Sequence, residues 1–123
     1  MFPQNLTQPQ REAIFDLLLL GMYADSGVKL AENEQVFALT EQLGWESYQD
    51  RSEYSETATS RVRAANETDA ATSAFLLQLS GRLADDDVKK LALGLLAKLL
   101  EADHQATESE AAFYQKAQSV FEV

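Results

Sequence analysis

Residues 16–32 read DLLLLGMYADSGVKLAE, and residues 94–110, GLLAKLLEADHQATESE, repeat their pattern. Each stretch begins in a leucine-rich helix, reaches an Ala-Asp pair, and has a glutamate seven residues after that aspartate. A single offset aligns Leu17 with Leu95, Leu18 with Leu96, Asp25 with Asp103 and Glu32 with Glu110. The repeat predicts two similar units, each made of a helix, an acidic loop and a second helix.

Apolar residues recur at helical spacing along the whole chain, and no stretch alternates as a half-buried strand would. The helix that follows the Thr7–Gln10 capping box runs to Tyr23 and is apolar over more than half of its circumference, so it should be central. The leucine-rich helix that ends near Ala102 has the same character. We therefore predict an all-α fold, a compact bundle of about six to seven helices with two central apolar helices related by pseudo-twofold symmetry. Residues 1–123 should form a single domain.

Four further helices are expected from the same spacing of apolar residues. They cover residues 36–43, a polar stretch within 46–67, residues from the start cluster at 66–69 to about Leu83, and residues 107–121. Asp85, Asp86 and Asp87 precede the second leucine-rich helix. Aspartates at a helix start serve as a cap and as partners of the helix dipole, which we favour here over a cation site.

The chain has a formal net charge of −10 and no cysteine. A negative field of this size repels phosphate backbones and anionic lipid surfaces, so we expect neither nucleic acid nor membrane as a partner. A cation or a protein with a basic face fits better, although the same acidity would also simply keep a small domain in solution. The longest apolar run, residues 17–24, is too short to cross a bilayer. Because the N-terminus lacks the features of a signal peptide, we expect a cytoplasmic protein.

Four acidic residues mark the two corners of the repeat: Asp25, Glu32, Asp103 and Glu110. Asp25 and Asp103 each follow the C-terminus of a helix, where the helix dipole disfavours a negative charge by about 0.3–1 kcal/mol. A bound cation would offset that cost, and carboxylate oxygens together with a loop carbonyl suit calcium or magnesium. We therefore predict that these residues bind a divalent cation such as calcium, and we predict no other cofactor.

Other interactions would also explain these carboxylates. Lys29 can neutralise Asp25, and Thr107 with Glu110 has the spacing of a capping box that needs no metal. An EF-hand is excluded by its spacing, because Leu30 stands where that loop requires glycine when Asp25 is counted as its first residue.

Catalytic motifs are weak in this sequence. Glu101 and His104 have the Glu-x-x-His spacing of di-iron bundles, but those sites need two such motifs and the chain has one histidine. Neither a nucleophile elbow nor a glycine-rich phosphate loop occurs. We therefore predict that the protein is not an enzyme.

The doubled Ala-Asp corners resemble the tellurite-resistance TerB-like family of all-helical domains. The resemblance is carried by residues 22–32 and 101–110. It implies a compact bundle with two central helices, and it implies a role for the four corner carboxylates in metal binding. On this basis we expect a stress-related interaction or metal-sensing module.

The polar helix within residues 46–67 supports an alternative. It carries Tyr48, Tyr54, Arg61 and Arg63, and tyrosine and arginine are favoured anchors at protein interfaces. The alternative is a purely structural protein–protein interaction domain that binds no ligand and uses this helix as its contact surface. The sequence leaves the identity of the protein partner and the oligomeric state open.

Overall fold

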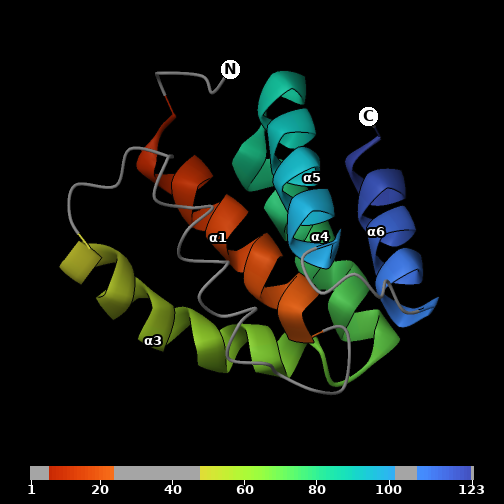
Figure 1. Ribbon diagram of the computed structural model, residues 1–123, viewed down its shortest axis with the longest axis horizontal. Helices are drawn as coiled ribbons and strands as arrows, with labels where there is room; N and C mark the ends of the chain where they lie inside the picture. The colour runs from red at the N-terminus through yellow and green to blue at the C-terminus, as the bar shows by residue number, and fades with distance from the viewer. Residues whose placement is uncertain (1–5, 24–47, 102–107, 123) are drawn as a thin grey trace.

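The computed structural model describes residues 6–23, 48–101 and 108–122, and Figure 1 shows their arrangement. These residues form five α-helices and no strand: α1 (Gln8–Tyr23), α3 (Tyr48–Ala65), α4 (Asp69–Leu83), α5 (Asp86–Glu101) and α6 (Glu108–Phe121). The predicted all-α bundle is thereby confirmed. The helix predicted over residues 36–43 lies outside the described residues, so the total of six to seven helices stays a prediction.

Helix α1 is the centre of the bundle. Every side chain from Ala13 to Leu20 is buried, and α1 packs against each of the other four described helices. Helix α4 also packs against all four, through Phe75, Leu76 and Leu79 among others. Helix α5 packs directly against α1 but is amphipathic, with one face turned to solvent. The pseudo-twofold relation between the two leucine-rich helices stays a prediction.

The two leucine-rich helices meet near their C-termini. A Cβ atom placed on Gly21 would lie 2.5 Å from Cδ1 of Leu96 and 3.8 Å from Cδ2 of Leu99, so only a hydrogen at this position lets α1 approach α5 so closely. Gly21 is two residues from the end of α1, and Leu99 is two residues from the end of α5. The two helices therefore finish side by side at one end of the bundle (Figure 1).

The helix starts follow their sequence signals. In α1 the backbone N–H of Gln10 donates to Oγ1 of Thr7 at 3.2 Å, and the N–H of Thr7 donates to Oε1 of Gln10 at 2.9 Å, which is the predicted capping box. Oγ1 of Thr68 caps α4 by accepting from the N–H of Ala71 at 3.0 Å. In the aspartate cluster, Oδ1 of Asp85 accepts from the N–H of Asp87 at 3.1 Å, as expected of a cap rather than a cation ligand.

A tight turn joins α4 to α5. Ala84 has a φ of 64° and a ψ of −49°, and the N–H of Asp85 donates to the carbonyl of Leu83 at 2.7 Å. This is a γ-turn of the rare kind with a positive φ, a conformation that strains a residue carrying a Cβ atom. Nε2 of Gln10 donates to the same carbonyl of Leu83 at 3.0 Å. One side chain therefore serves both the start of α1 and the end of α4.

Candidate functional site

Asp16 is the only charged residue among the described positions whose side chain is completely buried. It lies in the middle of α1, within the leucine-rich stretch, with Phe15 and Leu17 beside it at 0% exposure. An isolated carboxylate in such surroundings would be prohibitively costly, so its partners decide whether the helix can occupy the core.

Three side chains from two other helices surround this carboxylate. Nη1 of Arg82 donates to Oδ2 of Asp16 at 2.9 Å, and the hydroxyl of Tyr54 donates to Oδ1 at 2.7 Å. Nη2 of Arg61 lies 3.3 Å from Oδ1 and 3.2 Å from Oδ2. Because Tyr54 and Arg61 come from α3 and Arg82 from α4, the Asp16 cluster joins three helices at one point.

The members of the cluster also hold one another. Nη2 of Arg61 donates to the hydroxyl oxygen of Tyr54 at 2.8 Å, and its guanidinium carbon lies 5.6 Å from the centroid of the Tyr54 ring. That ring meets Phe15 edge-on, with centroids 5.7 Å apart and an interplanar angle of 87°. The phenol of Tyr54 is thus fixed on both its polar and its apolar sides.

Two members of the cluster, Tyr54 and Arg82, have raised pKa values. Burial raises the pKa of Tyr54 well above its ordinary value of 10.0, and the charge of Asp16 and the hydrogen bond to it raise it further. Burial alone would lower the pKa of Arg82, but its interactions with Asp16 and Tyr54 outweigh that effect and raise it. Tyr54 therefore remains a neutral donor and Arg82 a cation over the whole physiological range.

The side chains that surround the carboxylate are partly exposed to solvent. The side chain of Arg61 is 39% exposed and that of Arg82 is 26% exposed, whereas that of Asp16 is inaccessible. Nη2 of Arg82 also lies 4.0 Å from Oε1 of Glu12, one helical turn before Asp16. A fully buried carboxylate with both oxygens occupied by donors is suited to holding three helices in register.

Two of the predicted interaction residues belong to this cluster. Tyr54 and Arg61 lie on α3 as expected, but their polar groups are directed inward to Asp16. Arg63 is exposed on the same helix. Tyr48 is the first residue of α3, and its side chain lies outside the described residues.

Three of the four predicted metal ligands, Asp25, Glu32 and Asp103, lie outside the described residues. Glu110 falls in the first turn of α6, which is where the sequence placed it, although only its backbone is described. Across the described residues there is no group of three or more His, Cys, Asp or Glu side chains that could hold a metal ion. Within the same ranges, no helix is both long and apolar enough to span a bilayer.

The sequence interpretation missed Asp16 and Arg82. The available signal was that Asp16 is the only charged residue from Ala13 to Ala24, in a helix expected to be buried on most sides. A lone carboxylate in that position requires cationic partners, and the arginine-rich helix nearby could have supplied them.

Comparison with protein-family models, with curated proteins and with solved structures gives no match.

Proposed function

We propose that this protein is a non-catalytic, cytoplasmic, stress-related interaction or metal-sensing module of the TerB-like kind, which binds a divalent cation such as calcium. The ligands would be Asp25, Glu32, Asp103 and Glu110. The proposal draws on the repeated acidic corners of the sequence, and one feature of the bundle supports it.

The supporting observation is the meeting of α1 and α5 near their C-termini. Gly21 approaches Leu96 and Leu99, so the chain leaves both leucine-rich helices at the same end of the bundle. Phe113 of α6 is also near, because a Cβ on Gly21 would lie 3.5 Å from its Cε2. Segments that start from neighbouring helix ends can bring their carboxylates to one cation, whereas segments starting at opposite ends could not.

The electrostatics of that end also favour a cation. The C-terminus of each helix carries the negative end of its dipole, and here two of them lie together. Helix α5 has Lys98 in its last turn, whereas α1 has no basic residue in its last turn. Among the described residues, the helix end without a basic side chain in its last turn is that of α1. We therefore expect the corner that follows it, with Asp25 and Glu32, to contribute most to binding.

The test is a calcium titration of the protein followed by calorimetry and by amide resonances. We expect heat of binding and shifted resonances around residues 25–32, with weaker affinity in the variant Asp25→Asn. The matched control is Asp87→Asn, which removes one exposed carboxylate at the opposite end of α5 and should leave the affinity unchanged. Absence of both heat and shifts at millimolar calcium would rule the cation out.

The alternative function is a protein-interaction domain that uses α3, and the exposure of Arg63 favours it. The inner side of this helix packs through Ala58, Val62 and Ala65, which leaves its outer side to solvent. Arg63 is the clean probe of this surface, since replacing Tyr54 or Arg61 would also disturb Asp16. If Arg63→Glu retains every partner recovered with the native protein, α3 is not the contact surface.

A further inference from the structure

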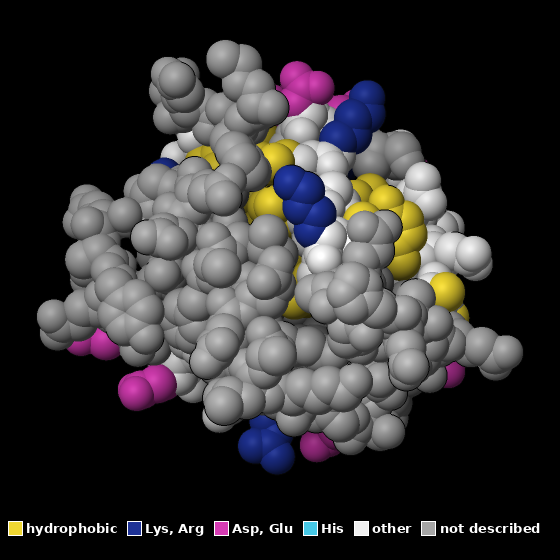
Figure 2. All heavy atoms as spheres, in the orientation of Figure 1, with side chains coloured by type: hydrophobic (Ala, Val, Ile, Leu, Met, Phe, Trp, Pro, Cys, Tyr) yellow, Lys and Arg dark blue, Asp and Glu magenta, His cyan; other side chains and the backbone are white. Residues whose placement is uncertain are grey.

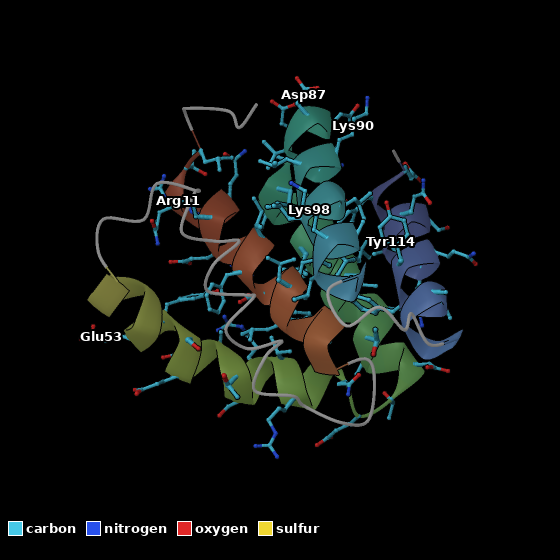
Figure 3. The ribbon with its side chains drawn as sticks, in the orientation of Figure 1. Arg11, Glu53, Asp87, Lys90, Lys98 and Tyr114 are labelled. Carbon is cyan, nitrogen blue, oxygen red and sulfur yellow. The ribbon has the colours of Figure 1, made fainter. Side chains whose placement is uncertain are left out.

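The outer face of α5 differs from the rest of this acidic molecule. Lys90, Gly94 and Lys98 follow one another at four-residue intervals and are all exposed, and no acidic residue occurs from Val88 to Leu100. Figure 3 shows Lys98 across the front of α5 and Lys90 projecting sideways from its upper part, with Asp87 at the start of the helix. The result is a short basic stripe on a chain whose net charge is −10.

Gly94 in the middle of this stripe has no role in the described fold. A Cβ atom added there would meet nothing within 4 Å among the described residues, in contrast to Gly21. An exposed glycine in a helix interior is less stable than almost any other residue, because it loses the most backbone freedom on folding. Glycine at such a position is useful where another backbone must come close.

Apolar side chains border the stripe. Leu91 and Ala97 of α5 and Tyr114 of α6 are each half-buried, and Leu91 and Tyr114 pack on the core with their outer parts uncovered. Figure 2, in the same orientation as Figure 3, shows apolar side chains on both sides of a basic side chain near the middle of the view. The face therefore combines bordering apolar side chains, two lysines and a glycine over which another backbone can pass closely.

We propose that this face of α5, made of Lys90, Leu91, Gly94, Ala97, Lys98 and Tyr114, binds an acidic amphipathic helix of a partner protein. The two lysines are eight positions apart, which places them about 12 Å apart along the helix axis at 1.5 Å per residue. A partner helix with two carboxylates at the same separation would pair with both lysines, and its apolar stripe would cover Leu91 and Tyr114. A small residue of the partner would pass over Gly94.

The distribution of charge favours a single acidic helix over a nucleic acid or an anionic lipid surface. A nucleic acid or an anionic lipid surface would meet the field of the whole acidic chain over a wide area, whereas a single helix meets mainly the local lysines. The net charge opposes long-range attraction, so the contact depends on short-range pairs and apolar burial. This proposal rests on the protein being an interaction module, and it is independent of cation binding.

The test uses a designed helical peptide of 18 residues with a leucine stripe and two glutamates eight positions apart on the edge of that stripe. The control peptide has the same composition, with the glutamates on the opposite face. Both are titrated into the native protein in the presence of a chelator, with the amide resonances recorded. We expect saturable shifts centred on Gly94, Lys90 and Lys98, and affinity for the control peptide at least about tenfold weaker.

Protein variants complete the test. Lys90→Glu with Lys98→Glu should weaken binding at least about tenfold, and Gly94→Gln, which adds a solvated side chain at the point of approach, should also weaken it. Arg63→Glu on α3 reverses a charge elsewhere and should bind as the native protein does. Thermal unfolding checks that each variant is folded.

Equal binding of the two peptides, equal effects of the α5 and α3 variants, or no shifts at millimolar peptide would each overturn the proposal. Repeating the titration with calcium distinguishes its failure from that of the cation site.

Discussion

Asp16 and Arg82 are 66 residues apart in the chain, yet Oδ2 of Asp16 accepts a hydrogen bond of 2.9 Å from Nη1 of Arg82. Asp16 is fully buried, whereas Arg82 is partly exposed, so the two members of this ion pair differ in what happens when the other is removed. A buried carboxylate that loses its partner stays desolvated, whereas a partly exposed guanidinium can turn to water.

We therefore expect Arg82→Met to be the more damaging substitution. It should lower the free energy of unfolding by about 2–4 kcal/mol, because Asp16 keeps its burial but loses its shortest cationic contact. Asp16→Asn should cost about 1–2 kcal/mol, because the amide remains hydrogen-bonded and both arginines reach solvent. Urea unfolding of the single variants and the double variant measures both costs and their coupling. A larger loss for Asp16→Asn than for Arg82→Met would contradict this account.

Tyr54 should make the stability of the protein fall at alkaline pH. Its pKa in the folded state is raised above the ordinary value of 10.0, mainly by burial and then by the charge of Asp16. The stabilisation is therefore complete below pH 10, where the phenol is protonated in both states, and is lost as the pH rises toward the raised pKa, because unfolding releases a proton. Tyr54→Phe should cost about 1.5–3 kcal/mol at pH 7, since it removes a hydrogen bond to a carboxylate.

The check is unfolding at pH 7, 9 and 11, compared between the native protein and Tyr54→Phe. The difference in stability between them should shrink from pH 9 to pH 11. A constant difference over that range would show that Tyr54 is not a neutral donor to Asp16.

Gln10 can be dissected by two substitutions. Gln10→Glu retains an acceptor for the N–H of Thr7 but removes the donor to the carbonyl of Leu83, whereas Gln10→Ala removes both. We expect Gln10→Ala to cost about 1–2 kcal/mol as a lost cap together with a lost tertiary hydrogen bond. Thermal unfolding should place Gln10→Glu between the native protein and Gln10→Ala. Equal values for the native protein and Gln10→Glu would mean that the bond to Leu83 contributes nothing.

The glycines of α1 and α5 should respond oppositely to alanine. Gly94→Ala should raise the free energy of unfolding by about 0.5–1 kcal/mol, because the position is exposed and open. Gly21→Ala should lower it by about 1 kcal/mol, because the new methyl group would overlap Leu96 in a closely packed core. Denaturant unfolding compares the two. The double variant Gly21→Ala with Leu96→Ala should lose less free energy of unfolding than the two single variants together. A rise in the free energy of unfolding for both glycine variants would show that Leu96 can move aside at little cost.

The sequence predicted local features of the fold well, because each depends on a few neighbouring residues. The capping box of Thr7 and Gln10, a start of α4 within residues 66–69 and a cap within the aspartates 85–87 are all confirmed, with Thr68 and Asp85 as the capping residues. These signals come from side chains that bond to backbone groups three residues away or fewer. The central place of α1 was also predictable, because a helix that is apolar on most sides has to be buried.

The Asp16 cluster was not predicted, because it depends on how three helices cross. Helical spacing shows that Tyr54 and Arg61 lie near each other on α3, but it cannot show that α4 brings Arg82 to the same point. The two residues were therefore interpreted as anchors for a partner, whereas their polar groups are bonded within the bundle. Pairing across long separations in sequence has no local signal.

Ala84 has a mechanical consequence. Only Ala84 and Asp85 separate α4 from α5, and two hydrogen bonds to the carbonyl of Leu83 hold the turn between them. The two helices should therefore move together as one rigid unit. Arg82 lies two residues before Ala84 and donates a hydrogen bond to the buried carboxylate of Asp16 in α1. A displacement of α5 from its solvent side would therefore shift Arg82 relative to Asp16 in the core of the bundle.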